Sequence, residues 1–160
     1  MVLAGVLLFV GGAQRIAVGD VSAAVLCRVS NTSVHPVPGR PSFNFGSARL
    51  AVALPEGARF AAIPAASPGG ANAFIQKNGW IRTKTGWFAA RGTPKVTGRR
   101  VNGSGRRLRA DVGPLSSTAG GPFYPSNLYF PSFGCWRITA MAGGARLNAT
   151  VRVFRLLHRG

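Results

Sequence analysis

The chain has 160 residues, which is enough for one domain with a hydrophobic core and too few for two. Hydrophobic residues make up 46% of it, which excludes intrinsic disorder, although twenty Lys and Arg against three acidic residues give a net charge of +17. This surplus favours contact with polyanions such as nucleic acid, anionic lipid or acidic cell-envelope polymers. A solvated basic surface without a defined partner is the alternative.

The N-terminal segment 1–24 is predicted to be a signal peptide or an anchor. Its residues 2–10 form an apolar run of signal-peptide length. Arg15 and Asp20 interrupt any longer apolar span, and because a membrane-crossing helix needs about 20 mostly apolar residues, they argue against a spanning helix. The alternative is that 2–10 form a first core strand.

Residues 25–156 are predicted to form one all-β domain, followed by a short basic tail at 157–160. The 22 Gly and 11 Pro residues divide the chain into short pieces in which apolar and polar residues alternate. Residues 47–54 are predicted to be a strand that ends at the turn Pro55-Glu56-Gly57. Residues 58–63 are predicted to return as the next strand. The stretches 64–73 and 114–125 are rich in small residues, Gly or Pro and are predicted to be loops.

Two hairpins are predicted in the second half. Strands 95–101 and 106–112 flank Asn102-Gly103-Ser104-Gly105, and strands 136–142 and 145–154 flank Gly143-Gly144, both of which are turn sequences. Strands at such spacing imply a sandwich or a barrel. The predicted core comprises Leu50, Val52, Leu54, Val96, Leu108, Trp136, Ile138, Leu147, Val151 and Val153.

Cys27 and Cys135 are the chain's two cysteines. An even count in an apparently exported domain of this size favours a disulfide between them. Lipidation of Cys27 is one alternative, although Ala24-Val25-Leu26 lacks the small residue that a lipobox places next to its cysteine. Two free buried thiols in a cytosolic protein are the other alternative.

Several motifs of the second half, taken together, resemble a set of exported bacterial proteins with an immunoglobulin-like sandwich. The motifs are Gly86-Trp87-Phe88, Thr97-Gly98-Arg99-Arg100-Val101, Leu108-Arg109-Ala110 and Phe130-Pro131-Ser132-Phe133-Gly134-Cys135-Trp136. The likeness covers about residues 25–154, and Cys27 has a counterpart near the mature N-terminus of those proteins. It implies a single immunoglobulin-like β-sandwich and export to the cell envelope or beyond, and it implies no activity. Arg137 stands where those proteins tend to carry an acidic residue, so this chain is more basic than the pattern.

Catalytic and metal-binding residues are scarce. Asp20, Glu56 and Asp111 are the acidic residues, and we expect Glu56 to be a solvated turn residue and Asp111 to pair with an arginine. His35 and His158 are far apart in the sequence and lack clustered partners, so no metal site is expected. A Ser/His/Asp arrangement is spatial and stays open, but no Gly-x-Ser-x-Gly elbow occurs. We therefore expect no enzyme and no cofactor.

Two groups of residues could bind a partner. Arg99, Arg100, Arg106, Arg107 and Arg109 repel one another across the predicted hairpin and could gather around an anion, the alternative being splayed, hydrated side chains. Trp80, Trp87 and Tyr124 could contact sugars or bases, the alternative being core packing. The expected function is a non-catalytic exported or cell-envelope protein, binding or structural in role. The alternative is a basic binder of anionic polymers or lipid head groups, without sequence-specific recognition of nucleic acid.

Overall fold

The computed structural model describes residues 27–33, 35–66, 70–103, 105–118 and 120–157. The predicted signal or anchor at 1–24 lies outside these residues, and of the predicted tail at 157–160 only the exposed Leu157 is described. The described residues form eleven strands and one short 3-10 turn, which confirms the all-β prediction. None of their helical residues forms a segment long and apolar enough to cross a membrane.

The strands vary from two to eleven residues in length. In chain order they are β1 (Phe45–Gly46), β2 (Leu50–Val52), β3 (Arg59–Pro64), β4 (Ala73–Ile75), β5 (Ile81–Ala89), β6 (Lys95–Arg100), β7 (Arg109–Val112), β8 (Ser116–Thr118), β9 (Gly121–Phe130), β10 (Gly134–Ala142) and β11 (Ala145–Arg155), with η1 (Glu56–Ala58) between β2 and β3.

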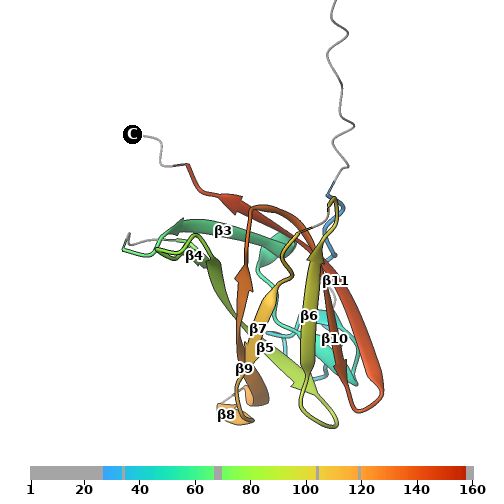
Figure 1. The fold of residues 1–160 in the computed structure, drawn as a ribbon. Coiled ribbons are helices and arrows are strands. Elements are labelled where there is room, and N and C mark those ends of the chain that lie inside the picture. The colour runs from blue at the N-terminus through green and yellow to red at the C-terminus, as the bar shows by residue number, and fades with distance from the viewer. Residues whose placement is uncertain (1–26, 34, 67–69, 104, 119, 158–160) are drawn as a thin grey trace, which may run out of the picture.

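The strands form one mixed sheet, shown in Figure 1. Its path runs β1-β2-β5-β4-β3-β11-β10-β6, and β9 joins β5 on the opposite edge and carries β7 and β8. One edge of β5 is shared, because its first residues pair with β4 and its last residues with β2. This arrangement puts β10 between β11 and β6, and β9 pairs with none of these three strands.

β3 pairs in parallel with both β4 and β11. The sequence suggested that 58–63 return after 47–54, but β2 pairs with β1 and β5 instead. The chain changes direction at η1, where Gly57 and Ala58 have φ angles of 58° and 50° and Ala58 N donates to Pro55 O. After this left-handed turn, β3 pairs with the C-terminal end of β11. The successive strands β2 and β3 therefore do not pair with each other.

β10 and β11 form the hairpin that the sequence predicted. They pair over nine register positions, from Gly134 opposite Val153 to Ala142 opposite Ala145. Gly143 and Gly144 connect them with φ angles of 51° and 77°, and this left-handed backbone is the reason that the turn needs two glycines.

The predicted hairpin between 95–101 and 106–112 is corrected by the structure. β6 and β7 meet at one isolated bridge between Gly98 and Leu108, and β7 forms its ladder with β9. A continued β6–β7 ladder would bring the arginines at 99–100 and 106–107 opposite one another, and like charges in that arrangement are destabilising. The β6–β7 pairing ends at this one bridge, so these arginines form no such ladder.

The predicted loop at 114–125 is also corrected, because it contains β8 and the first half of β9. β8 pairs with β9 from Ser116 opposite Phe123 to Thr118 opposite Gly121. Pro122 and Pro125 both lie in β9, where proline supplies no N–H. The composition of this segment is typical of a loop. It forms a strand because β9 pairs with the long strand β5, beginning with Tyr124 opposite Trp87.

The core lies along the inner side of the curved sheet. Nine of the ten predicted core residues are buried, and the tenth, Val96, is partly buried against them. Trp87 and Trp136 are the largest fully buried side chains. Trp87 Nε1 donates to Ser126 Oγ at 2.8 Å and Trp136 Nε1 to Ser132 O at 3.0 Å, so both buried indole N–H groups have partners.

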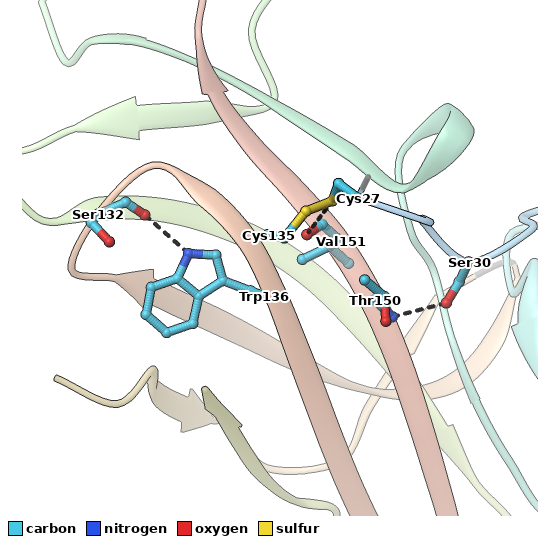
Figure 2. Close-up of a disulfide and its surroundings, with 7 residues drawn as sticks. All are labelled: Cys27, Ser30, Ser132, Cys135, Trp136, Thr150 and Val151. Atoms are coloured by element: carbon cyan, nitrogen blue, oxygen red, sulfur yellow. Dashed lines mark hydrogen bonds between the residues drawn. A yellow bond between two sulfur atoms is a disulfide. The ribbon is translucent and has the colours of Figure 1, made fainter. Parts of the chain in front are cut away.

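Cys27 and Cys135 are joined by a disulfide, as the sequence predicted, with Cα atoms 5.7 Å apart. Figure 2 shows the bridge beside β11, while the Trp136 ring points to the other side of β10. The first described segment continues along β11, where Ser30 N donates to Thr150 O and Thr150 N donates to Ser30 Oγ, both at 2.9 Å. The bridge and these hydrogen bonds therefore fix this segment along the edge of β11 that faces away from β10.

Candidate anion-binding face

The outer side of β6, β10 and β11 carries five exposed basic side chains, and Arg107 joins them from the connection after β6. Strand alternation sends Trp136, Ile138 and Ala140 inward and Arg137, Thr139 and Met141 outward. The same alternation applies to the neighbouring strands. We call this surface the basic face, and its cations are Lys95, Arg99, Arg107, Arg137, Arg146 and Arg152.

The register of the three strands arranges the outward residues in rows. Met141 lies opposite both Lys95 and Arg146. In the next row, Thr139 lies opposite Thr97 and Asn148, and its hydroxyl donates to Asn148 Oδ1 at 2.8 Å. These rows place a neutral polar strip beside the basic side chains of β6 and β11.

The following rows restore positive charge. Arg137 lies opposite Arg99 on one side and Thr150 on the other, and Cys135 lies opposite Arg152. Six residue positions separate the first row from the last, and at about 3.4 Å per residue the basic face extends roughly 20 Å along the strands.

The centre of the basic face is hollowed. An open depression of about 750 Å³ is lined by Arg99, Arg107, Arg137 and Arg146 together with Thr97, Gly98, Thr139, Met141 and Asn148. Arg107 reaches it from the connection between β6 and β7. A smaller depression of about 230 Å³ adjoins it and includes Arg100. Four cations and several hydroxyl or amide groups therefore share one concave surface.

Neither of the described acidic residues lies among these cations. Glu56 is exposed in η1, as expected of a turn residue. Asp111 lies in β7 and pairs with Arg109 at 3.3 Å, which confirms the predicted pairing with an arginine. Because both side chains are largely exposed, at 70% and 47%, this ion pair is weak. The positive charge of the basic face is thus not neutralised by these carboxylates.

The structure divides the five arginines that the sequence grouped. Arg99 and Arg107 line the large depression, and Arg100 lines the smaller one beside it. Arg106 is exposed in the connection after β6. Arg109 lies apart, with its guanidinium 5.4 Å from the centre of the Tyr129 ring. Three of the five arginines of the predicted cluster, Arg99, Arg100 and Arg107, therefore line the two adjoining depressions.

The predicted cluster did not include two further arginines of the large depression, Arg137 and Arg146. The signal that could have found them is the alternation of β10 and β11, which already put both side chains on the outward face. What the alternation did not give was the pairing of β6 with β10, and this pairing brings Arg99 beside Arg137.

The three aromatic residues proposed for ligand contact lie in different surroundings. Trp87 has 0% exposure, so its side chain packs in the core and is not available for contact. Tyr124 is partly buried against the core, and Trp80 is partly buried just before β5. None of them lines the basic face, and none of the described residues that line its depression is aromatic.

Of the residues considered for catalysis or metal binding, His35, Glu56 and Asp111 are described. His35 Nδ1 lies 3.0 Å from Pro41 O, and His158 and Asp20 lie outside the described residues. Among the described residues, no three His, Cys, Asp or Glu side chains are grouped as metal ligands.

No protein-family model matches this chain, and comparison with curated proteins finds no match. The basic face is therefore interpreted from its own geometry.

Proposed function

We propose that this chain is a non-catalytic, exported or cell-envelope protein that binds anionic polymers through the basic face. The observation that carries the proposal is the depression in which Arg99, Arg107, Arg137 and Arg146 meet without a described carboxylate among them. Guanidinium groups recognise carboxylate, sulfate and phosphate oxygens through paired N–H donors. A negatively charged ligand would relieve their mutual repulsion.

The length of the basic face favours a polymer over a single small anion. The rows of charge span roughly 20 Å along the strands, which is far more than one phosphate or sulfate group can contact. The strip of Thr97, Thr139 and Asn148 between the charged rows supplies hydroxyl and amide groups for the uncharged parts of such a chain. Without an aromatic side chain for base stacking, the lining favours backbone charge over base identity.

The disulfide supports export, because such bonds persist in oxidising compartments. An immunoglobulin-like sandwich remains a prediction. The all-β class and the disulfide that attaches the first described segment to β10 support it. The parallel pairing of β3 with β4 and β11 is the feature that an all-antiparallel sandwich does not contain.

The test is the salt dependence of binding to heparin and to single-stranded DNA, with the disulfide intact. Affinity should fall linearly on a plot of log K against log salt concentration. For single-stranded DNA each neutralised phosphate contributes about 0.7 to the slope, so the double variant Arg99→Ser/Arg137→Ser should reduce the slope by about 1.4.

The matched control removes the same charge elsewhere. Arg49 and Lys77 are exposed and lie in turns outside the basic face, before β2 and before β5 respectively. Arg49→Ser/Lys77→Ser should leave the slope unchanged. Equal losses in both double variants would show a diffuse positive field, and the proposal would then be wrong.

A further inference from the structure

A second surface, on the outer side of β5, β9 and β7, differs in chemistry from the basic face. The register places Lys84 of β5 opposite Asn127 of β9, and Asn127 opposite Asp111 of β7. Neighbouring strands are about 4.8 Å apart, so this row of amine, amide and carboxylate is about 10 Å long. Its formal charge is zero on a chain whose net charge is +17.

Beside this row two glycines allow close packing of Phe123 and Pro125. Gly86 lies opposite Pro125, and Gly113 N donates to Pro125 O at 2.7 Å. A Cβ at Gly86 would lie 3.1 Å from Phe123 Cδ2, and one at Gly113 would lie 3.2 Å from Pro125 Cγ. Glycine at both positions thus lets Phe123 and Pro125 lie close to the backbone. Beside them is a depression of about 580 Å³, which we call the β9 hollow, lined among others by Lys84, Asp111, Asn127, Phe123 and Pro125.

The aromatic wall of the β9 hollow is held in place from behind. Phe123 packs against a small cluster that contains Val37, Phe43 and Ala51. The adjoining Arg40 donates to Pro122 O at 2.6 Å, and its guanidinium lies 4.8 Å from the centre of the Phe88 ring. The Phe123 ring is thus positioned before any ligand arrives, which lowers the entropy lost on binding.

We propose that the β9 hollow binds an uncharged sugar ring of a glycan. Sugar hydroxyls both donate and accept hydrogen bonds, and the Lys84-Asn127-Asp111 row offers both kinds of partner along one line. The C–H face of a sugar ring is apolar and weakly positive, and it fits against Phe123 and Pro125, because an aromatic face carries negative charge. Asp111 pairs with Arg109 at 3.3 Å, and its carboxylate oxygens are hydrogen-bond acceptors for sugar hydroxyls.

This site is independent of the basic face, since it uses three other strands. The test is NMR titration of the full, disulfide-intact chain with neutral oligosaccharides of glucose, mannose, galactose and N-acetylglucosamine. We expect at least one of them to shift the Asn127 side-chain amide and the Phe123 backbone amide, with an affinity that raised salt leaves unchanged. Asp111→Ala and Asn127→Ala should each weaken it about tenfold, the loss expected for a hydrogen bond to a charged or buried partner.

The matched control is Arg99→Ser/Arg137→Ser, which should leave neutral-sugar affinity unchanged even if it abolishes heparin binding. Asp111→Asn keeps the shape of the side chain and removes its charge. It distinguishes a loss of sugar affinity caused by the missing carboxylate from one caused by a change in the fold. The proposal is overturned if no sugar shifts these signals, if Asp111→Ala and Asn127→Ala bind as the parent chain does, or if heparin shifts the same signals more strongly than every neutral sugar.

Discussion

Arg99 in β6 and Arg137 in β10 lie directly opposite each other in an antiparallel ladder, and neither described acidic residue lies on that face. Cβ atoms of such cross-strand partners are about 5 Å apart, so two positive charges in this position repel each other. The pair therefore lowers stability slightly in the free protein. A bound polyanion would turn the same pair into a favourable contact.

Arg137→Glu should consequently change stability and binding in opposite directions. A carboxylate opposite Arg99 replaces repulsion with attraction, which should raise the free energy of unfolding by a few tenths of a kcal/mol. The same change puts negative charge in the depression and should sharply lower the salt concentration at which the chain elutes from heparin. Urea unfolding and heparin chromatography measure the two effects.

Lys77→Glu is the control for this prediction, because it reverses one exposed charge in the turn before β5. It should have a small effect on heparin elution and none of the gain in stability. If Lys77→Glu and Arg137→Glu shift elution equally, the Arg99–Arg137 pair has no special role.

Removing the disulfide should destabilise the fold markedly. Cys27 and Cys135 are 108 positions apart, and in the chain-entropy model a closed loop of about 100 residues stabilises the folded state by up to about 4.7 kcal/mol. Cys27→Ala/Cys135→Ala should lower the urea midpoint accordingly. Non-reducing mass spectrometry of the parent chain from its native compartment provides the check, since two alkylatable thiols there would contradict the bridge.

The hydrogen bond from Trp87 Nε1 to Ser126 Oγ should be important for stability, because both groups are buried. Ser126→Ala leaves the indole N–H without its partner and should cost about 1–3 kcal/mol. Trp87→Phe removes the donor together with part of the core packing. Unfolding of both single variants and the double variant gives the coupling energy, and a coupling near zero would show that the bond contributes nothing.

Gly98→Ala should weaken the bridge between β6 and β7. A Cβ at this position would lie 3.0 Å from Leu108 Cβ and 3.2 Å from Arg137 O, so Leu108 or the strand must shift. Overpacking of this kind costs about 1–3 kcal/mol. Hydrogen exchange at the Leu108 amide, which donates to Gly98 O, should become faster. Thr97→Ala, at the exposed neighbouring position, should leave that exchange rate unchanged.

Local alternation was enough to predict the β10–β11 hairpin and most of the core. Leu147, Val151 and Val153 alternate with polar residues over the length of a strand, and two glycines mark the turn between β10 and β11. Both signals lie within about twenty residues of sequence. The pairing of the two cysteines was predictable for a different reason, since an even count of two leaves one possible intramolecular bridge.

Long-range pairing could not be predicted in this way. Turn residues between 101 and 106 suggested that β6 and β7 form a hairpin, but β7 pairs with β9. The Pro and Gly content of 114–125 suggested a loop, but β5 supplies a partner for the start of β9. In both cases pairing with a strand outside the local segment decided the structure.

The candidate sites, too, were predictable only where they depend on local sequence. The sequence by itself determined that the chain is basic, all-β and outwardly charged on β10 and β11, because these properties depend on composition and on the two-residue period of a strand. Only the tertiary structure decided that Arg137 and Arg146 share a depression with Arg99 and Arg107, that Arg109 does not, and that Lys84, Asn127 and Asp111 form one row. Register between strands far apart in sequence fixes these neighbours, and register is set by the packing of the whole core.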